Sequence, residues 1–150
     1  MKDTPQGWPR IASAAFYEKP KDAISFLCEA FGFEVQMLVE GEDGAVHHSQ
    51  LTLGEGLIMV VSAGAPPHRP DETHRRSPRE VDGANTQSMM IFVDSADEHC
   101  ERARAAGAVI THEPETTDYG ADYWADRNYE AVDPEGHHWW FTERVRDPVS

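Results

Sequence analysis

The sequence has few cysteines, few basic residues and no long hydrophobic run. Its 150 residues include 2 cysteines, and 27 acidic residues stand against 13 lysines and arginines, for a net charge of −14. No apolar stretch approaches the roughly 20 residues that a membrane-spanning helix needs, so no membrane partner is expected. A surface this acidic repels phosphate backbones, which argues against nucleic acid as a partner. It would attract a cationic small molecule.

Both cysteines, Cys28 and Cys100, fall in segments with a helical pattern and apolar neighbours. We expect them to be buried free thiols, with a disulfide or a reactive thiol as the alternative. The first residues show no apolar core behind their charge, so a signal peptide is not expected. The expected location is cytoplasmic.

The first part of the chain predicts one helix and four strands. Residues 10–17 are small, apolar and aromatic, as in a strand. Pro20 suits the first turn of a helix, and Gly32 suits its end. Further strand-like segments follow at residues 33–40, 45–53 and 57–62. The predicted order is strand, helix and three strands.

Residues 63–86 interrupt this pattern with four prolines, two glycines and the most basic stretch of the chain. Prolines and glycines at this density break regular elements, so we interpret the segment as a long surface loop. Loops of this length are usually functional or disordered. The sequence does not decide between the two.

The same order of elements then repeats. Asp94 or Ser95 caps a second predicted helix, which Gly107 ends. The predicted strands around it cover residues 87–93, 108–112, 127–132 and 137–143. Because Gly32 and Gly107 lie 75 residues apart, half the chain, a tandem repeat is the simplest account. We predict one domain over residues 1–150, with modules at about 10–62 and 87–144.

Several segments resemble the vicinal-oxygen-chelate superfamily of glyoxalases, bleomycin-resistance proteins and extradiol dioxygenases. They are residues 23–33 (AISFLCEAFGF), residues 102–108 (RARAAGA), Tyr119-Gly120 and the turn at 133–137 (DPEGH). The resemblance covers about residues 10 to 144 and is nearest to bacterial glyoxalase/bleomycin-resistance-like proteins. It implies an α+β fold in which tandem βαβββ modules form a curved mixed sheet around a cleft, with the helices outside.

In the metalloenzymes of that superfamily, four strands each supply one metal ligand, usually His or Glu. The matching positions here hold Ala12, Met59 or Val60, Ser88 and Trp140. None of these is a good ligand for a divalent metal, and neither are their neighbours Ile11, Ser13, Met89 and Trp139. We therefore expect no cofactor. The alternative is a divalent metal at a displaced site that uses His48, His138 or Gln87.

Aromatic and polar side chains in the expected cleft are the candidate ligand-binding residues. Strand alternation sends His48 and Gln50 to one face, and it groups His138 with Trp140. The aromatic stretch 119–129 (YGADYWADRNY) is typical of a lid over a cleft, although a packed loop is the alternative. Within it, Arg127 has a ligand carboxylate, Asp126 or Asp133 as expected partners. The predicted ligand-binding residues are Phe16, His48, Gln50, Met59, Trp124, Arg127, Tyr129, His138 and Trp140.

We therefore predict a metal-free protein that sequesters a small aromatic or cationic molecule. The resemblance also implies a homodimer whose cleft is completed at the dimer interface. One alternative is a lyase, isomerase or dioxygenase of the glyoxalase type, with a displaced metal or with His48 as a metal-free base. Another is a domain without a ligand, whose cleft is filled by its own Trp140, Met59 and Phe16.

Overall fold

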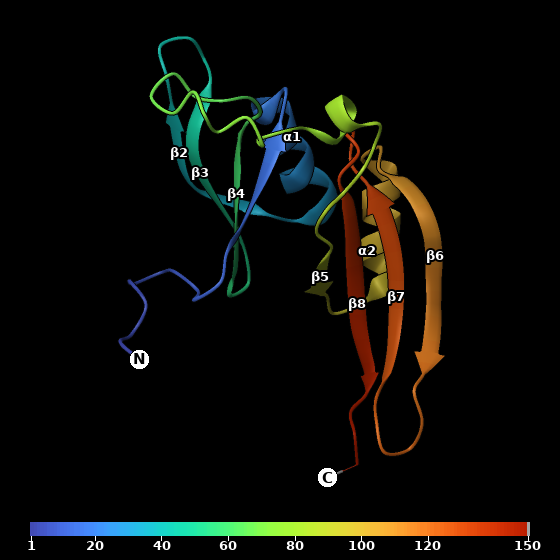
Figure 1. Ribbon diagram of the computed structural model, residues 1–150. Helices are drawn as coiled ribbons and strands as arrows, with labels where there is room; N and C mark the ends of the chain where they lie inside the picture. The colour runs from blue at the N-terminus through green and yellow to red at the C-terminus, as the bar shows by residue number, and fades with distance from the viewer. Residues whose placement is uncertain (150) are drawn as a thin grey trace.

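The computed structural model describes residues 1–149 and shows two modules with one order of elements (Figure 1). Module one comprises β1 (Ser13–Tyr17), α1 (Pro20–Phe26), the π-helical turn η1 (Leu27–Phe31), β2 (Glu34–Glu40), β3 (Val46–Leu53) and β4 (Gly56–Ser62). Module two comprises β5 (Met89–Phe92), α2 (Ala96–Ala105), β6 (Val109–Asp118), β7 (Ala125–Val132) and β8 (His138–Arg146). The predicted α+β class and the tandem βαβββ repeat are confirmed.

Each module forms its own four-stranded mixed sheet. The strand order is β1-β4-β3-β2 in module one and β5-β8-β7-β6 in module two. The first strand of each module runs parallel to the last, and the other pairs are antiparallel. The predicted curved sheet thus consists of two hydrogen-bonded sheets with the same topology.

The helices cover one face of each sheet and meet in a core that both modules share. In Figure 1, α2 lies behind β7 and β8, and α1 lies beside β1 on the side toward module two. The ring of Phe31, from the end of the first helix, lies 5.6 Å from that of Trp139 and 4.8 Å from that of Phe141, both on β8. All three side chains are fully buried. Burying an aromatic side chain stabilises the fold by roughly 2–3 kcal/mol, so this contact joins the modules strongly.

The helix ends follow the sequence signals. Gly32 adopts a left-handed conformation with φ of 83° directly after η1, and Gly107 does so with φ of 99° after α2. Such backbone angles favour glycine, which has no Cβ to clash. Ser95, one of two predicted caps, accepts a hydrogen bond from the backbone N–H of Glu98. Both cysteines are free, with Cys100 buried and Cys28 half-buried.

A turn at residues 133–137 ties the two modules together. Asp133 Oδ2 accepts hydrogen bonds from the Tyr17 hydroxyl (2.6 Å) and from Trp139 Nε1 (3.1 Å). Glu135 accepts from the backbone N–H groups of Glu18 (2.7 Å) and Lys19 (2.8 Å) at the start of module one. Burial beside Asp133 raises the pKa of Tyr17 well above its ordinary value, so the hydroxyl stays a donor. The aspartate of this motif therefore has a structural role.

The segment 63–86 packs against that turn and contains one regular element that the sequence analysis did not expect. The 3₁₀ helix η2 (Pro78–Val81) has Ser77 as its N-cap. Ser77 and Glu80 form a capping box, in which each side chain accepts a hydrogen bond from a backbone N–H at the start of the helix. The Ser77 hydroxyl donates to Glu135 (2.6 Å), and Arg79 donates to the carbonyl of Pro134 (2.9 Å). Within residues 1–149, no helix is both long and apolar enough to span a bilayer.

The aromatic stretch 119–129 is not a lid loop. β6 extends to Asp118 and β7 begins at Ala125, so the stretch forms the tip of a hairpin and the start of a strand. The predicted strand 108–112 ends at His112, whereas β6 continues through residues 113–118 (EPETTD), which are polar or proline. Pairing with β7 supports a strand there in spite of that polarity.

Candidate ligand-binding site

Each sheet has one face packed on its helix and one face without a helix. On β8, Trp139 and Phe141 are buried in the core, so Trp140 and Thr142 point to the other side. Pairing across the sheet extends this row to Met90 on β5 and Glu130 on β7. We name this surface the helix-free face of module two. It carries Met90, Phe92, His112, Asp126, Asn128, Glu130, His138, Trp140, Thr142 and Arg144.

The helix-free face of module one holds four of the predicted residues: Phe16, His48, Gln50 and Met59. Gln50 Nε2 lies 2.8 Å from His48 Nε2 and 3.7 Å from Met37 Sδ. Segments outside the module cover this face. The Trp8 ring stacks 6.2 Å from that of His48, while the Arg75 guanidinium lies 5.6 Å above Phe16 and His74 packs on the same ring.

The helix-free face of module two has a charged centre. Glu130 has a buried carboxylate, with side-chain exposure of 8%, and it contacts two imidazoles. One carboxylate oxygen lies 3.1 Å from His112 Nδ1, and the other pairs with His138 Nδ1. The His112 ring also lies 5.1 Å from that of Trp140. An anionic group, two proton-binding groups and a large aromatic ring thus share one patch.

A second aromatic group lies beside this patch, toward the tip of the β6–β7 hairpin. The Arg144 guanidinium lies 5.5 Å from the Phe92 ring and 5.3 Å from the ring of the predicted residue Trp124. Arg144 Nε donates to Asp126 (2.6 Å), and that carboxylate raises the pKa of Arg144. The cation is therefore fixed between two aromatic side chains.

Two predicted residues, Arg127 and Tyr129, lie on the helix-packed side of β7 instead. Arg127 donates to both oxygens of Asp97 on α2, at 2.9 and 2.8 Å, and not to Asp126 or Asp133 as expected. Tyr129 is fully buried, and its hydroxyl lies 2.5 Å from His99 Nδ1. Burial raises the pKa of Tyr129. Strand alternation separates these side chains from His138 and Trp140.

Three of the residues that the resemblance predicts at metal-ligand positions lie on strands of the two sheets. Met59 and Trp140 lie on the helix-free faces, whereas Val60 is buried in the core. Among residues 1–149 there is no group of three or more His, Cys, Asp or Glu side chains placed to hold a metal ion. In particular, the two imidazoles at Glu130 face different oxygens of the carboxylate.

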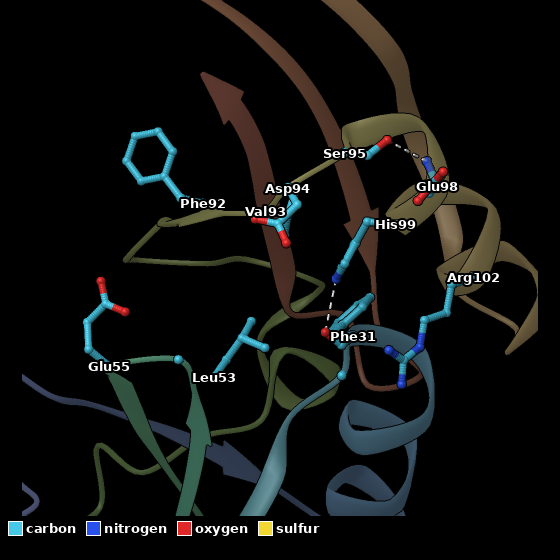
Figure 2. Close-up of a pocket in the computed structure, with 12 residues that line it drawn as sticks. Phe31, Leu53, Glu55, Phe92, Val93, Asp94, Ser95, Glu98, His99 and Arg102 are labelled. Carbon is cyan, nitrogen blue, oxygen red and sulfur yellow. Dashed lines mark hydrogen bonds between the residues drawn. The ribbon is translucent and has the colours of Figure 1, made fainter. Parts of the chain in front are cut away.

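A cavity of about 630 Å³ lies between the β3–β4 turn and the start of α2 (Figure 2), and Phe92 of the helix-free face of module two is among the residues that line it. Phe31 and Leu53 form apolar parts of its wall, and Glu55, Asp94 and Glu98 add carboxylates. His99 also lines it, but Nε2 of this ring donates to the carbonyl of Phe31 (2.9 Å). None of the predicted ligand-binding residues lines this cavity.

Comparison with known proteins agrees with the architecture. The sequence profile of the Glyoxalase/Bleomycin resistance protein/Dioxygenase superfamily matches residues 10–141. The chain belongs to this superfamily. The resemblance found in the sequence is thereby confirmed.

Individual relatives of this superfamily member include an uncharacterized protein of Mycobacterium bovis, 25% identical over 93% of this chain and 86% of the relative. TioX from Micromonospora sp. ML1 is 26% identical, with a TM-score of 0.69 over 92% of this chain and all of that one (100%). TnmS3, an antibiotic binding protein from Streptomyces sp. CB03234, shares the fold at 17% identity. Its TM-score is 0.61 over 89% of this chain and 93% of that one.

Sequence reasoning missed Glu130, the partner of His138, and His112, the second histidine that pairs with Glu130. The predicted strands 127–132 and 137–143 leave a four-residue turn at 133–136. Such a turn would place Glu130 opposite Trp139, which faces the core. The observed ladder pairs Val132 with His138, so Glu130 lies opposite Trp140. A shift of one residue moves a side chain to the other face of a strand. The pairing of β6 with β7 is irregular on both sides of His112, so strand alternation alone could not predict which face of the sheet His112 lies on.

Proposed function

We propose that this protein binds a small aromatic or cationic molecule on the helix-free face of module two, without a metal. The observation that carries the proposal is the patch of Trp140, His138 and His112 around the buried carboxylate of Glu130. An aromatic surface beside a few placed polar groups is the usual composition of a small-molecule site. The acidic surface, with a net charge of −14, favours a cation over an anion.

We further propose that a second copy of the chain completes the site. Large apolar side chains on the open sheet faces are exposed, with Met90 at 61%, Phe92 at 53% and Met37 at 46%. Exposed apolar patches of this kind commonly mark an interface. A dimer would enclose the patch around Trp140 and bring the module-one residues His48, Gln50, Phe16 and Met59 into the site as a second wall.

Antibiotic binding by TnmS3 supports the class of function, since that protein shares the fold. The sequestered compound would then be an aromatic or cationic antibiotic. The usual ligand positions of the metalloenzymes hold Met59 and Trp140 here, which also supports binding without a metal.

An enzymatic function is the second candidate, and one observation favours it. A carboxylate bonded to one nitrogen of an imidazole fixes the tautomer and prepares the other nitrogen as a base. Glu130 and His138 have this relation. His48 is the corresponding base on module one, although its Nε2 is bonded to Gln50.

The test combines metal analysis with a ligand screen. Protein purified without a nickel column is analysed for Zn, Ni, Mn and Fe, and thermal shifts are recorded with divalent ions and with aromatic and cationic antibiotics. We expect no stoichiometric metal, stabilisation by a cationic aromatic compound and a dimer by native mass spectrometry. A stoichiometric metal that raises the melting temperature would favour the metalloenzyme and contradict the proposal.

A further inference from the structure

The carboxylate of Glu130 differs in its partners from two other carboxylates of module two. Asp126, on the same face, pairs with Arg144, and Asp97, on the opposite side, pairs with Arg127. Within residues 1–149, Glu130 forms no ion pair with a lysine or arginine, and its two partners are histidines. When both imidazoles are neutral, its negative charge is not balanced by a fixed cation.

The two histidines lie over this charge on the helix-free side of the sheet. Their side chains are 63% exposed for His112 and 39% exposed for His138, whereas Glu130 lies beneath them at 8%. Trp140, which pairs with Glu130 across the strands, packs against His112. A ligand resting on Trp140 would therefore lie beside Glu130 and its two imidazoles.

We propose that Glu130 selects for a positively charged group on the ligand, and that His112 and His138 make this selection depend on pH. This inference rests on the proposed function and specifies its ligand as an aromatic cation. Trp140 contacts the aromatic part through stacking and cation–π attraction, while Glu130 receives the charge. Desolvation of the buried carboxylate strengthens its attraction for the cation.

The pH dependence follows from counting charges around Glu130. With neutral imidazoles, the cluster carries one negative charge and attracts a cation. With both imidazoles protonated, it carries one positive charge and repels the same cation. Histidine side chains ordinarily gain a proton as the pH falls through about 6.5, so binding weakens on acidification.

Other charged groups on the same face do not supply this switch. On β7 and β8, Asp126 and Arg144 pair with each other. On β6, Glu115 shares the row of His112 but lies opposite Asn128 and not opposite Glu130. On β5, the residues on this face are Met90 and Phe92, which carry no charge. His112 and His138 are therefore the groups that change charge near Glu130.

The test compares two probes of similar shape, the permanent cation N-methylquinolinium and neutral quinoline, by isothermal titration calorimetry. At about pH 8, where histidines are ordinarily neutral, we expect the cation to bind at least about tenfold more tightly than quinoline. Glu130→Gln should weaken cation binding about tenfold and leave quinoline unchanged. Glu113→Gln is the matched control, since it removes an equal charge from β6 at a side chain that pairs with Arg104. It should bind as the unmodified protein does.

The pH series uses the cation alone. Lowering the pH from about 8 to about 5.5 should weaken its binding about tenfold in the unmodified protein, and less than about twofold in a His112→Gln, His138→Gln double variant. Equal binding of both probes, or a Glu130→Gln variant with unchanged cation affinity, would overturn this inference and leave the proposed function standing. If neither probe binds at any pH, both proposals fail.

Discussion

The two modules share one topology, yet their helix-free faces differ in chemistry and in cover. On module one, Trp8 stacks on His48, and the loop residues His74 and Arg75 lie against Phe16. On module two, the corresponding surface holds a buried carboxylate, two imidazoles and Trp140, and the loop residue Asn85 accepts a hydrogen bond from the backbone N–H of His138. Among the residues described, the charged and accessible chemistry is therefore concentrated in one half of the repeat.

This difference shows which side of a repeated sheet is constrained. The helix-packed rows of both modules bury aromatic and small residues, because each must exclude water from one shared core. The helix-free rows carry no such requirement, so they differ without loss of the fold. Function is expected where the two copies differ, and structure where they agree.

The largest expected effect tests whether the modules form one cooperative unit in spite of their different faces. Asp133→Ala removes the acceptor of the buried Tyr17 hydroxyl and of Trp139 Nε1. Leaving buried donors unpaired should lower the free energy of unfolding by about 3 kcal/mol or more. Urea denaturation followed by circular dichroism measures it, with the exposed Asp71→Ala as the control. A cost below about 1 kcal/mol would show that the turn does not join the modules.

A smaller loss of stability is expected when the hydrogen bonds between Ser49 and Val60 in module one are removed. The ladder between β3 and β4 ends at Leu51, and beyond it the buried Ser49 hydroxyl donates to the Val60 carbonyl (2.5 Å) and accepts from its N–H (2.7 Å). Ser49→Ala should cost about 1–3 kcal/mol by urea denaturation. The exposed Ser25→Ala should cost much less, and equal losses would contradict the role of Ser49.

His99, on the core side of module two, should make stability depend on pH. Burial lowers the pKa of His99 in the folded protein, although its bond to the Phe31 carbonyl opposes that shift. The unfolded chain therefore binds a proton first as the pH falls below about 6.5, and the folded state loses stability there. His99→Gln should lose less stability than the unmodified protein between about pH 7.5 and 5.5 in urea denaturation. A greater loss in the variant would contradict this assignment.

The smallest effect is expected at the ion pair on the helix-packed side of β7. Arg127 and Asp97 are 29% and 61% exposed, so solvent screens their attraction. Arg127→Gln should change the unfolding free energy by about 0–1 kcal/mol. Its ligand affinity should equal that of the unmodified protein, because the side chain points away from Trp140. A loss of ligand binding in this variant would show that Arg127 contributes to the ligand-binding site.

The fold followed from the sequence because its signals are local. Gly32, Gly107 and the DPEGH turn mark the ends of helices and strands. The spacing of the two glycines indicates the tandem repeat. Alternation alone also placed His48 with Gln50, and His138 with Trp140. Periodicity within one element was sufficient for these pairs.

The centre of the candidate site could not be predicted from the sequence, because it depends on how neighbouring strands pair. Glu130 reaches Trp140 only through the register of the β7–β8 hairpin, and His112 reaches Glu130 only through the irregular register of β6. Tyr129 and Arg127 were assigned to the cleft from their composition, which does not report the side of the strand. A single sequence fixes such registers weakly.

The most direct test of the account is to locate the ligand with methyl-labelled methionines. Met90 lies on the helix-free face of module two, Met37 and Met59 on that of module one, and Met89 pairs with Trp139 toward the core. Titration with N-methylquinolinium is followed by the methionine methyl resonances. We predict that the Met90 resonance shifts and that the Met89 resonance does not. Shifts confined to Met37 and Met59, or shifts of none of these methyl groups, would contradict binding on module two.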